Sequence, residues 1–155
     1  MTDLALRTFD AQRLAAFVTR RPNVDFMGAW KKLHAALGEQ GLAPGGPRML
    51  ATFEASALDG PGSMSTYAAA MTLANGESVR APLEELQVPA GRYATYLYVG
   101  PFEGMGAAWG RFVGALTAAG HALALERPCL ERYLDDPATT APAALRTELC
   151  VPIAG

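Results

Sequence analysis

Two stretches of the chain place apolar side chains at the spacing of a single helix face. The first set is Phe26, Trp30, Leu33 and Leu37, and the second set, 79 residues further on, is Met105, Trp109, Phe112 and Leu116. Within each set the spacing is i, i+4, i+7 and i+11, which forms an apolar stripe along an amphipathic helix. A proline precedes each stripe, and Gly41 or Gly120 follows it, where a left-handed residue can cap a helix. The pattern therefore predicts two helices.

Six extended runs surround these helices. One precedes each helix, at Leu14–Arg20 and Tyr93–Val99, and the second of these is rich in aromatic and β-branched residues. Two follow each helix, namely Arg48–Ala55, Ser65–Leu73, Pro128–Leu134 and Ala144–Ile153. Turn-forming residues fill the loops Leu58–Ser63 and Asp135–Pro142 between the paired runs. Each half of the chain thus predicts the order strand–helix–strand–strand.

The two halves also align with each other as sequences. Arg13–Ala43 matches Arg92–Ala122 without a gap, and the only two tryptophans, Trp30 and Trp109, fall in register. Such repeats indicate duplicated units that bury a core only by joining. We expect one α+β domain over residues 1–155, with two tandem SHS2-type modules, one main helix in each, related by a pseudo-twofold axis. Module 1 spans about 1–74, a linker spans 75–91, and module 2 spans about 92–155, with antiparallel sheets around a central groove.

Composition narrows the function classes. The net charge of −2 and the absence of a Lys/Arg run exclude an electrostatic surface for nucleic acid or membrane. The chain has no apolar stretch of membrane-spanning length, and its first residues lack the apolar block of a secretory signal. Two cysteines without a CxxC spacing favour a reduced, cytoplasmic setting. Two separated histidines argue against a metal site, and no phosphate loop or dinucleotide fingerprint predicts a cofactor.

Four short motifs carry a family resemblance. They are Pro89-Ala90-Gly91-Arg92-Tyr93-Ala94, Gly100-Pro101-Phe102, Glu131-Arg132-Tyr133-Leu134-Asp135-Asp136-Pro137 and Leu145-Arg146-Thr147-Glu148-Leu149-Cys150-Val151-Pro152. With them the chain resembles the GyrI-like family, also called the AraC-type effector-binding domain. The first half matches more loosely, through Arg13-Leu14-Ala15, Trp30 and the Asp59–Pro61 turn. Cys150 departs from the pattern, since that position is often tyrosine.

The resemblance implies two strand–helix–strand–strand modules whose sheets form a ligand-binding groove. Members of the family act as effector-sensing domains of transcription regulators, as stand-alone small-molecule binders, as a gyrase inhibitor, and in one branch as hydrolases of cyclopropane-containing toxins. No segment of this chain is left for a helix-turn-helix, so a regulator role is expected to need a partner chain.

Strand alternation selects the candidate groove residues. In the last run, Leu149 and its alternate neighbours form the core face, and Glu148 points to the other face. If the helices cover one sheet face, the other lines the groove; the resemblance then places a pocket glutamate at Glu148 and favours Glu131 as a second groove residue. The full candidate set is Glu148, Glu131, Tyr133, Tyr96, Tyr98, Trp109, Tyr67, Trp30, Phe53 and Cys150.

Each candidate has a structural alternative. Trp30 and Trp109 lie on the helix stripes, so they either pack in the core or line the groove. Glu148 is either a pocket residue or the partner of Arg146 or of a cross-strand cation, and the tyrosines either fill the sheet or touch ligand. The thiols of Cys129 and Cys150 are either buried and inert or redox-active.

Three functions follow from these residues. The first is binding of an amphipathic small molecule, aromatic or cationic, by aromatic side chains and a glutamate. The second is hydrolysis of a strained or reactive electrophile, with Glu148 or Glu131 as the base. The third is protein interaction, such as gyrase inhibition or service as the sensor subunit of a transcription regulator, with the chain as a monomer or homodimer.

Overall fold

The computed structural model describes residues 4–44, 48–59 and 64–155, and in those ranges it contains eight strands and two helices. In chain order they are β1 (Leu4–Phe9), β2 (Gln12–Arg20), α1 (Phe26–Glu39), β3 (Met49–Glu54), β4 (Thr66–Thr72), β5 (Glu84–Val88), β6 (Gly91–Val99), α2 (Met105–Ala119), β7 (Pro128–Tyr133) and β8 (Arg146–Pro152). The predicted α+β class is confirmed, and the strand–helix–strand–strand order occurs as β2-α1-β3-β4 and β6-α2-β7-β8. A pseudo-twofold relation between these units, and their limits as modules, stay predictions.

Two strands have no counterpart in the sequence-based prediction. β1 pairs with β6, and β5 pairs with β2 although it lies inside the segment 75–91 that was expected to be a linker. Both are edge strands with a single neighbour, so they bury little apolar surface and show little periodicity. The predicted turn at Asp59-Gly60-Pro61 extends into residues 60–63, which lie outside the described residues.

All strands belong to one antiparallel sheet with the order β1-β6-β8-β7-β3-β4-β2-β5. The pairing of β3 with β7 joins the two halves, with Ala51 opposite Glu131 and Phe53 opposite Cys129. The two halves therefore join in one continuous sheet. The sheet curls strongly. β1 and β5 stand at opposite ends of the strand order, yet Phe9 of β1 and Val88 of β5 lie in the same buried cluster.

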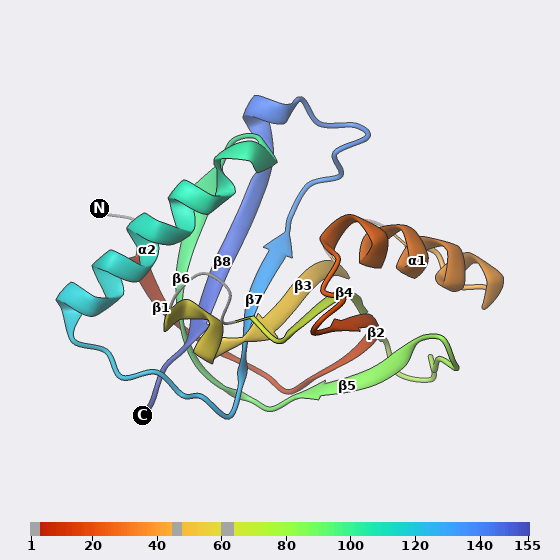
Figure 1. Ribbon diagram of the computed structural model, residues 1–155, viewed down its shortest axis with the longest axis horizontal. Coiled ribbons are helices and arrows are strands. Elements are labelled where there is room, and N and C mark those ends of the chain that lie inside the picture. Colours follow the sequence, from red (N-terminus) through yellow and green to blue (C-terminus); the bar gives the residue numbers. More distant parts are fainter. Residues whose placement is uncertain (1–3, 45–47, 60–63) are drawn as a thin grey trace.

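Both helices cover the same face of this sheet (Figure 1). Phe112 and Leu116 of α2 pack with Leu149 of β8, while Leu33 and Leu37 of α1 belong to a second cluster on β2, β3 and β4. The opposite, inner face of the curl encloses a third cluster that no helix covers. The face of the sheet that carries the helices thus has two separate buried clusters, one beneath each helix.

The helix ends follow the sequence signals. Asp25 caps the start of α1, where its side chain accepts a hydrogen bond of 3.0 Å from the backbone N–H of Gly28. Gly41 after α1 and Gly120 after α2 have φ values of 77° and 76°, so the predicted left-handed caps are confirmed. Neither helix has the length and apolar content that a membrane crossing requires.

Only the C-terminal parts of the two apolar stripes are fully buried. Leu33 and Leu37 in α1, like Phe112 in α2, have no exposed surface, whereas Phe26 at the start of α1 is 52% exposed. Trp30 and Trp109 are half-buried. The N-terminal parts of both helices therefore border a space that the core does not fill.

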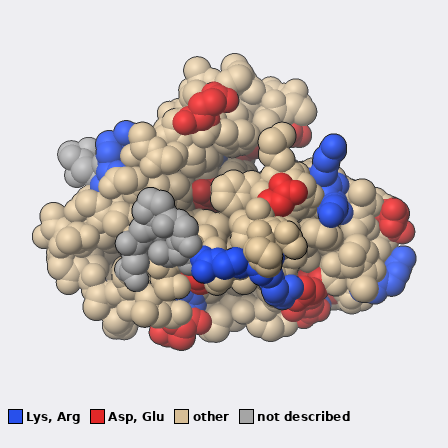
Figure 2. Space-filling model, in the orientation of Figure 1, with Lys and Arg blue, Asp and Glu red and all other residues tan. Residues whose placement is uncertain are grey.

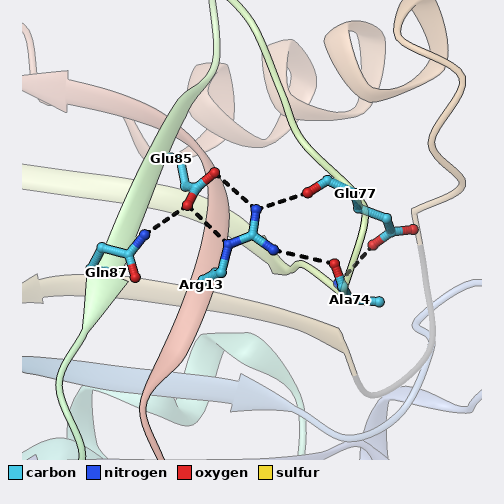
Figure 3. Close-up of polar contacts among 5 residues, drawn as sticks. All are labelled: Arg13, Ala74, Glu77, Glu85 and Gln87. Carbon is cyan, nitrogen blue, oxygen red and sulfur yellow. Dashed lines mark hydrogen bonds and ion pairs between the residues drawn. The ribbon is translucent and has the colours of Figure 1, made fainter.

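Arg13 ties the segment before β5 to β2 (Figure 3). Its guanidinium donates two hydrogen bonds of 3.0 Å to the two carboxylate oxygens of Glu85, and further hydrogen bonds to the backbone carbonyls of Ala74 and Glu77. Glu85 also accepts from the side chain of Gln87 at 2.6 Å. These contacts hold the edge strand β5 against β2. They add to the stability of this strand pair, in which β5 buries little apolar surface.

Replacing Arg13 by Gln is expected to lower the melting temperature more at pH 7 than at pH 3. The hydrogen bonds from Arg13 lower the pKa of Glu85 below its ordinary value. A carboxylate whose pKa is lower in the folded state stabilises the fold at any pH above its pKa in the unfolded state, about 4.3. This stability is lost as the pH falls through the pKa of the folded state. Thermal unfolding followed by circular dichroism measures the effect, with Arg111→Gln on α2 as control. An equal loss at both pH values would contradict the assignment.

Candidate ligand-binding cavity

A cavity of about 910 Å³ lies between the two helices, over the strands at the centre of the sheet. Figure 2 shows the corresponding recess in this face of the molecule, with acidic side chains in and beside it. Seven aromatic residues line it, namely Phe26, Trp30, Phe53, Tyr67, Phe102, Trp109 and Tyr133. β3 and β4 of the first half, β7 of the second half and both helices contribute to the lining, so the cavity exists only because the two halves of the chain share one sheet.

A single carboxylate, that of Glu131 on β7, lies among these aromatic rings. The indole N–H of Trp109 donates to Oε2 of Glu131 at 2.6 Å, and the hydroxyl of Tyr133 donates to Oε1 at 2.6 Å. Trp109 is fixed in turn by an edge-on contact with Phe53, with ring centroids 5.3 Å apart. Charge-assisted hydrogen bonds of this kind compensate a partly buried carboxylate.

A further hydrogen bond involves the other helix. The indole N–H of Trp30 on α1 donates to the hydroxyl oxygen of Tyr67 at 2.8 Å. The indoles of α1 and α2 therefore each donate to a polar side chain of the cavity lining, Trp30 to Tyr67 and Trp109 to Glu131.

The two phenols of the cavity lining resist ionisation. Burial, with the nearby charge of Glu131 as the second cause, raises the pKa of Tyr67 to about 12. The same causes, in the same order, raise the pKa of Tyr133 well above its ordinary value. Both hydroxyls therefore remain protonated donors at neutral pH.

The charged groups that line the cavity are acidic. Glu131, Asp135 and Asp136 belong to the lining, whereas no Lys or Arg among the described residues does. Asp135 is paired with Arg146 at 2.9 Å, and Oδ1 of Asp136 accepts from the backbone N–H of Ala138 at 2.8 Å. The cavity thus combines aromatic walls with a negative potential.

Six of the ten residues predicted from the sequence line this cavity. They are Trp30, Phe53, Tyr67, Trp109, Glu131 and Tyr133. For the two tryptophans, the groove alternative describes their position better than core packing, because each indole ring borders the cavity and its N–H donates to another lining side chain.

The structure places Glu148 away from the cavity. It lies on β8, between Thr147 and Leu149, which face the helices, so its own side chain points to the inner face of the curled sheet. There it forms ion pairs with Arg7 of β1 and Arg132 of β7. The expected groove on the helix-free face is corrected accordingly: the two helices leave an open space between them, whereas the curl closes the other face.

The remaining three predicted residues are also outside the lining. Tyr96 stacks on Phe112 of α2 with ring centroids 5.8 Å apart, and Tyr98 donates to the carbonyl oxygen of Pro101 at 2.6 Å. Cys150 is fully buried on the same face as Glu148, among the third cluster. Both cysteines are free thiols, and burial raises the pKa of each, as expected for inert core thiols rather than reactive ones.

Several residues of the cavity lining were not predicted from the sequence. Phe26, Met27 and Phe102 stand at the cavity rim and are 52%, 84% and 45% exposed. Phe26 lies on the apolar stripe of the first helix, and the stripe does not show which of its residues border a cavity. Its exposure becomes a signal only when the start of α1 is known to lie beside a cavity.

Fold and cavity together define an α+β domain with a ligand-sized aromatic pocket between two helices. The sequence profile of the GyrI-like small molecule binding domain matches residues 2–154, and the chain belongs to this family. No curated protein matches it in sequence.

Several solved structures share the fold. SAV2435 bound to tetraphenylphosphonium is 14% identical with a TM-score of 0.74, covering 99% of this chain and 95% of that chain. The EcmrR C-terminal domain is 17% identical with a TM-score of 0.73, covering 99% of both chains. A hydrolase from Listeria innocua is 11% identical with a TM-score of 0.63, covering 98% of this chain and 92% of that chain.

Replacing Glu131 by Gln is expected to lower the pKa of Tyr67 and Tyr133, because the carboxylate charge helps to raise both. Burial remains, so both values stay above that of a free phenol. A pH titration of tyrosinate absorbance measures the change, with circular dichroism to show that the fold persists. Glu126→Gln, whose side chain is 73% exposed, serves as the control. An unchanged titration would rule out an ionised Glu131 beside these hydroxyls.

Proposed function

We propose that the protein binds cationic, aromatic small molecules in the cavity between α1 and α2. The observation that carries this proposal is the Glu131 carboxylate, held among aromatic rings in a pocket whose described lining includes no Lys or Arg. A cation gains from the carboxylate and from the ring faces, where each cation–π contact contributes about 0.5–2 kcal/mol. An anion meets only acidic groups there.

The dimensions of the cavity support a ligand of drug size. Ligand pockets commonly measure roughly 300–1,000 Å³ and are mostly apolar with a few polar groups that fix orientation. The volume of about 910 Å³ lies in that range. SAV2435, which has the same fold, was solved with tetraphenylphosphonium, a cation with four aromatic rings, and this supports a lipophilic cation as the first ligand to test.

Hydrolysis of a reactive electrophile is the second candidate, and Glu131 is the observation that favours it. Since Glu148 lies on the opposite face, Glu131 is the carboxylate in position to act as a base. Both of its oxygens already accept hydrogen bonds from the protein, so we place binding first. Turnover that stops in Glu131→Gln while binding persists would reverse this order.

A sensor role toward another protein is compatible with ligand binding. EcmrR carries a C-terminal domain of this fold, and a ligand that bridges α1 and α2 would alter the surface formed by the helix starts. Co-purification from the native host with and without tetraphenylphosphonium tests this role. Absence of any ligand-dependent partner would leave the protein as a stand-alone binder.

Tetraphenylphosphonium is expected to bind wild-type protein. Glu131→Gln is expected to weaken binding about tenfold or more, because the substitution removes the negative charge that attracts the bound cation. Isothermal titration calorimetry measures both affinities. At 100 times Kd, the ligand stabilises the protein by about 2.7 kcal/mol in thermal unfolding. Glu148→Gln, on the other face of the sheet, should keep affinity within about twofold. An equal loss in both variants would contradict the assigned cavity.

A further inference from the structure

The side chains that donate to Glu131 have no hydrogen-bond donor left for a ligand. The indole N–H of Trp109 and the hydroxyl of Tyr133 both donate to this carboxylate. Each of these two groups has a single proton on its polar atom, so neither retains a donor. The indole N–H of Trp30 is also committed, because it donates to Tyr67.

Acceptor capacity remains at the same place. An ionised carboxylate offers about four lone-pair positions on its two oxygens. Each oxygen of Glu131 accepts one hydrogen bond from a described side chain. The carboxylate borders the cavity, so its remaining lone pairs are the acceptors that a ligand meets beside the aromatic rings.

Two other lining side chains carry a donor. The hydroxyl of Tyr67 accepts from Trp30, and His34 on α1 is exposed at the edge next to Trp30, with ring centroids 6.2 Å apart. Asp135 and Asp136 are further acceptors. At the Glu131 carboxylate itself, the two side chains that donate to it leave acceptor positions and no donor.

We propose that the ligand is an aromatic amine in its protonated form, which donates an N–H to Glu131, rather than a permanent cation without N–H groups. This inference rests on the proposed function and specifies its ligand class. A quaternary cation satisfies the charge of Glu131 but leaves its lone pairs without a donor in a partly desolvated site. A protonated amine satisfies both the charge and the hydrogen bond.

A methylation series on one aromatic frame tests this inference. The probes are 1-pyrenemethylammonium, its N,N-dimethyl form, which keeps one N–H, and its N,N,N-trimethyl form, which has none. In wild-type protein the last methylation is expected to weaken binding about tenfold or more, because a hydrogen bond to a charged group is lost. The first two methylations together are expected to change affinity much less. Calorimetry and pyrene fluorescence give the affinities.

The Glu131→Gln variant is the matched control. There the ratio between the dimethyl and trimethyl forms should fall to about twofold or less, since the charge that strengthens the hydrogen bond is gone. The series in wild-type protein is decisive by itself if this variant fails to fold. Equal or tighter binding of the trimethyl form to wild-type protein overturns the inference, as does a preference that persists in Glu131→Gln.

The two proposals fail in different ways. If tetraphenylphosphonium and all three pyrene cations bind equally well and depend on Glu131, cation binding stands and the amine preference is wrong. If no cation binds wild-type protein, both are wrong. Binding of 1-pyreneacetate as tight as that of the ammonium form overturns the donor count on which the inference is built.

Discussion

The carboxylate of Glu131 is the constraint around which the centre of the molecule is arranged. It lies on β7 at the junction of the two halves of the sheet, opposite Ala51 of β3, and its two oxygens take hydrogen bonds from Trp109 and Tyr133. An unpaired carboxylate in such surroundings is costly. The hydrogen bonds from Trp109 and Tyr133 compensate it, and Trp30 of the other helix donates to Tyr67. The two tryptophans of the repeat therefore line the cavity and do not close it.

This arrangement separates the buried part of the fold from the part that borders the cavity. The C-terminal part of each helix stripe is buried, while the N-terminal part, with Phe26 on α1 and Trp109 on α2, borders the cavity. On the inner face of the curl, Glu148 pairs with Arg7 of β1 and Arg132 of β7. The glutamate of β8 thus connects three strands, and the glutamate of β7 faces the cavity.

Periodicity predicted the parts of the fold that are well buried. Both helices and six strands follow from apolar spacing, because Leu33, Phe112 and similar side chains must reach a core. The edge strands β1 and β5 show no such spacing. For the site, alternation correctly places Glu148 and Leu149 on opposite faces, but it does not say which face is hollow. That depends on how the sheet curls and where the helices end, which are properties of tertiary packing.

The most direct test of the account is a crystal structure with tetraphenylphosphonium bound. The account predicts the phosphonium between α1 and α2, with phenyl rings against Trp30, Trp109 and Tyr133 and the positive centre on the side of Glu131. Density for the cation on the inner face of the sheet near Glu148, or at a surface distant from Glu131, would contradict it.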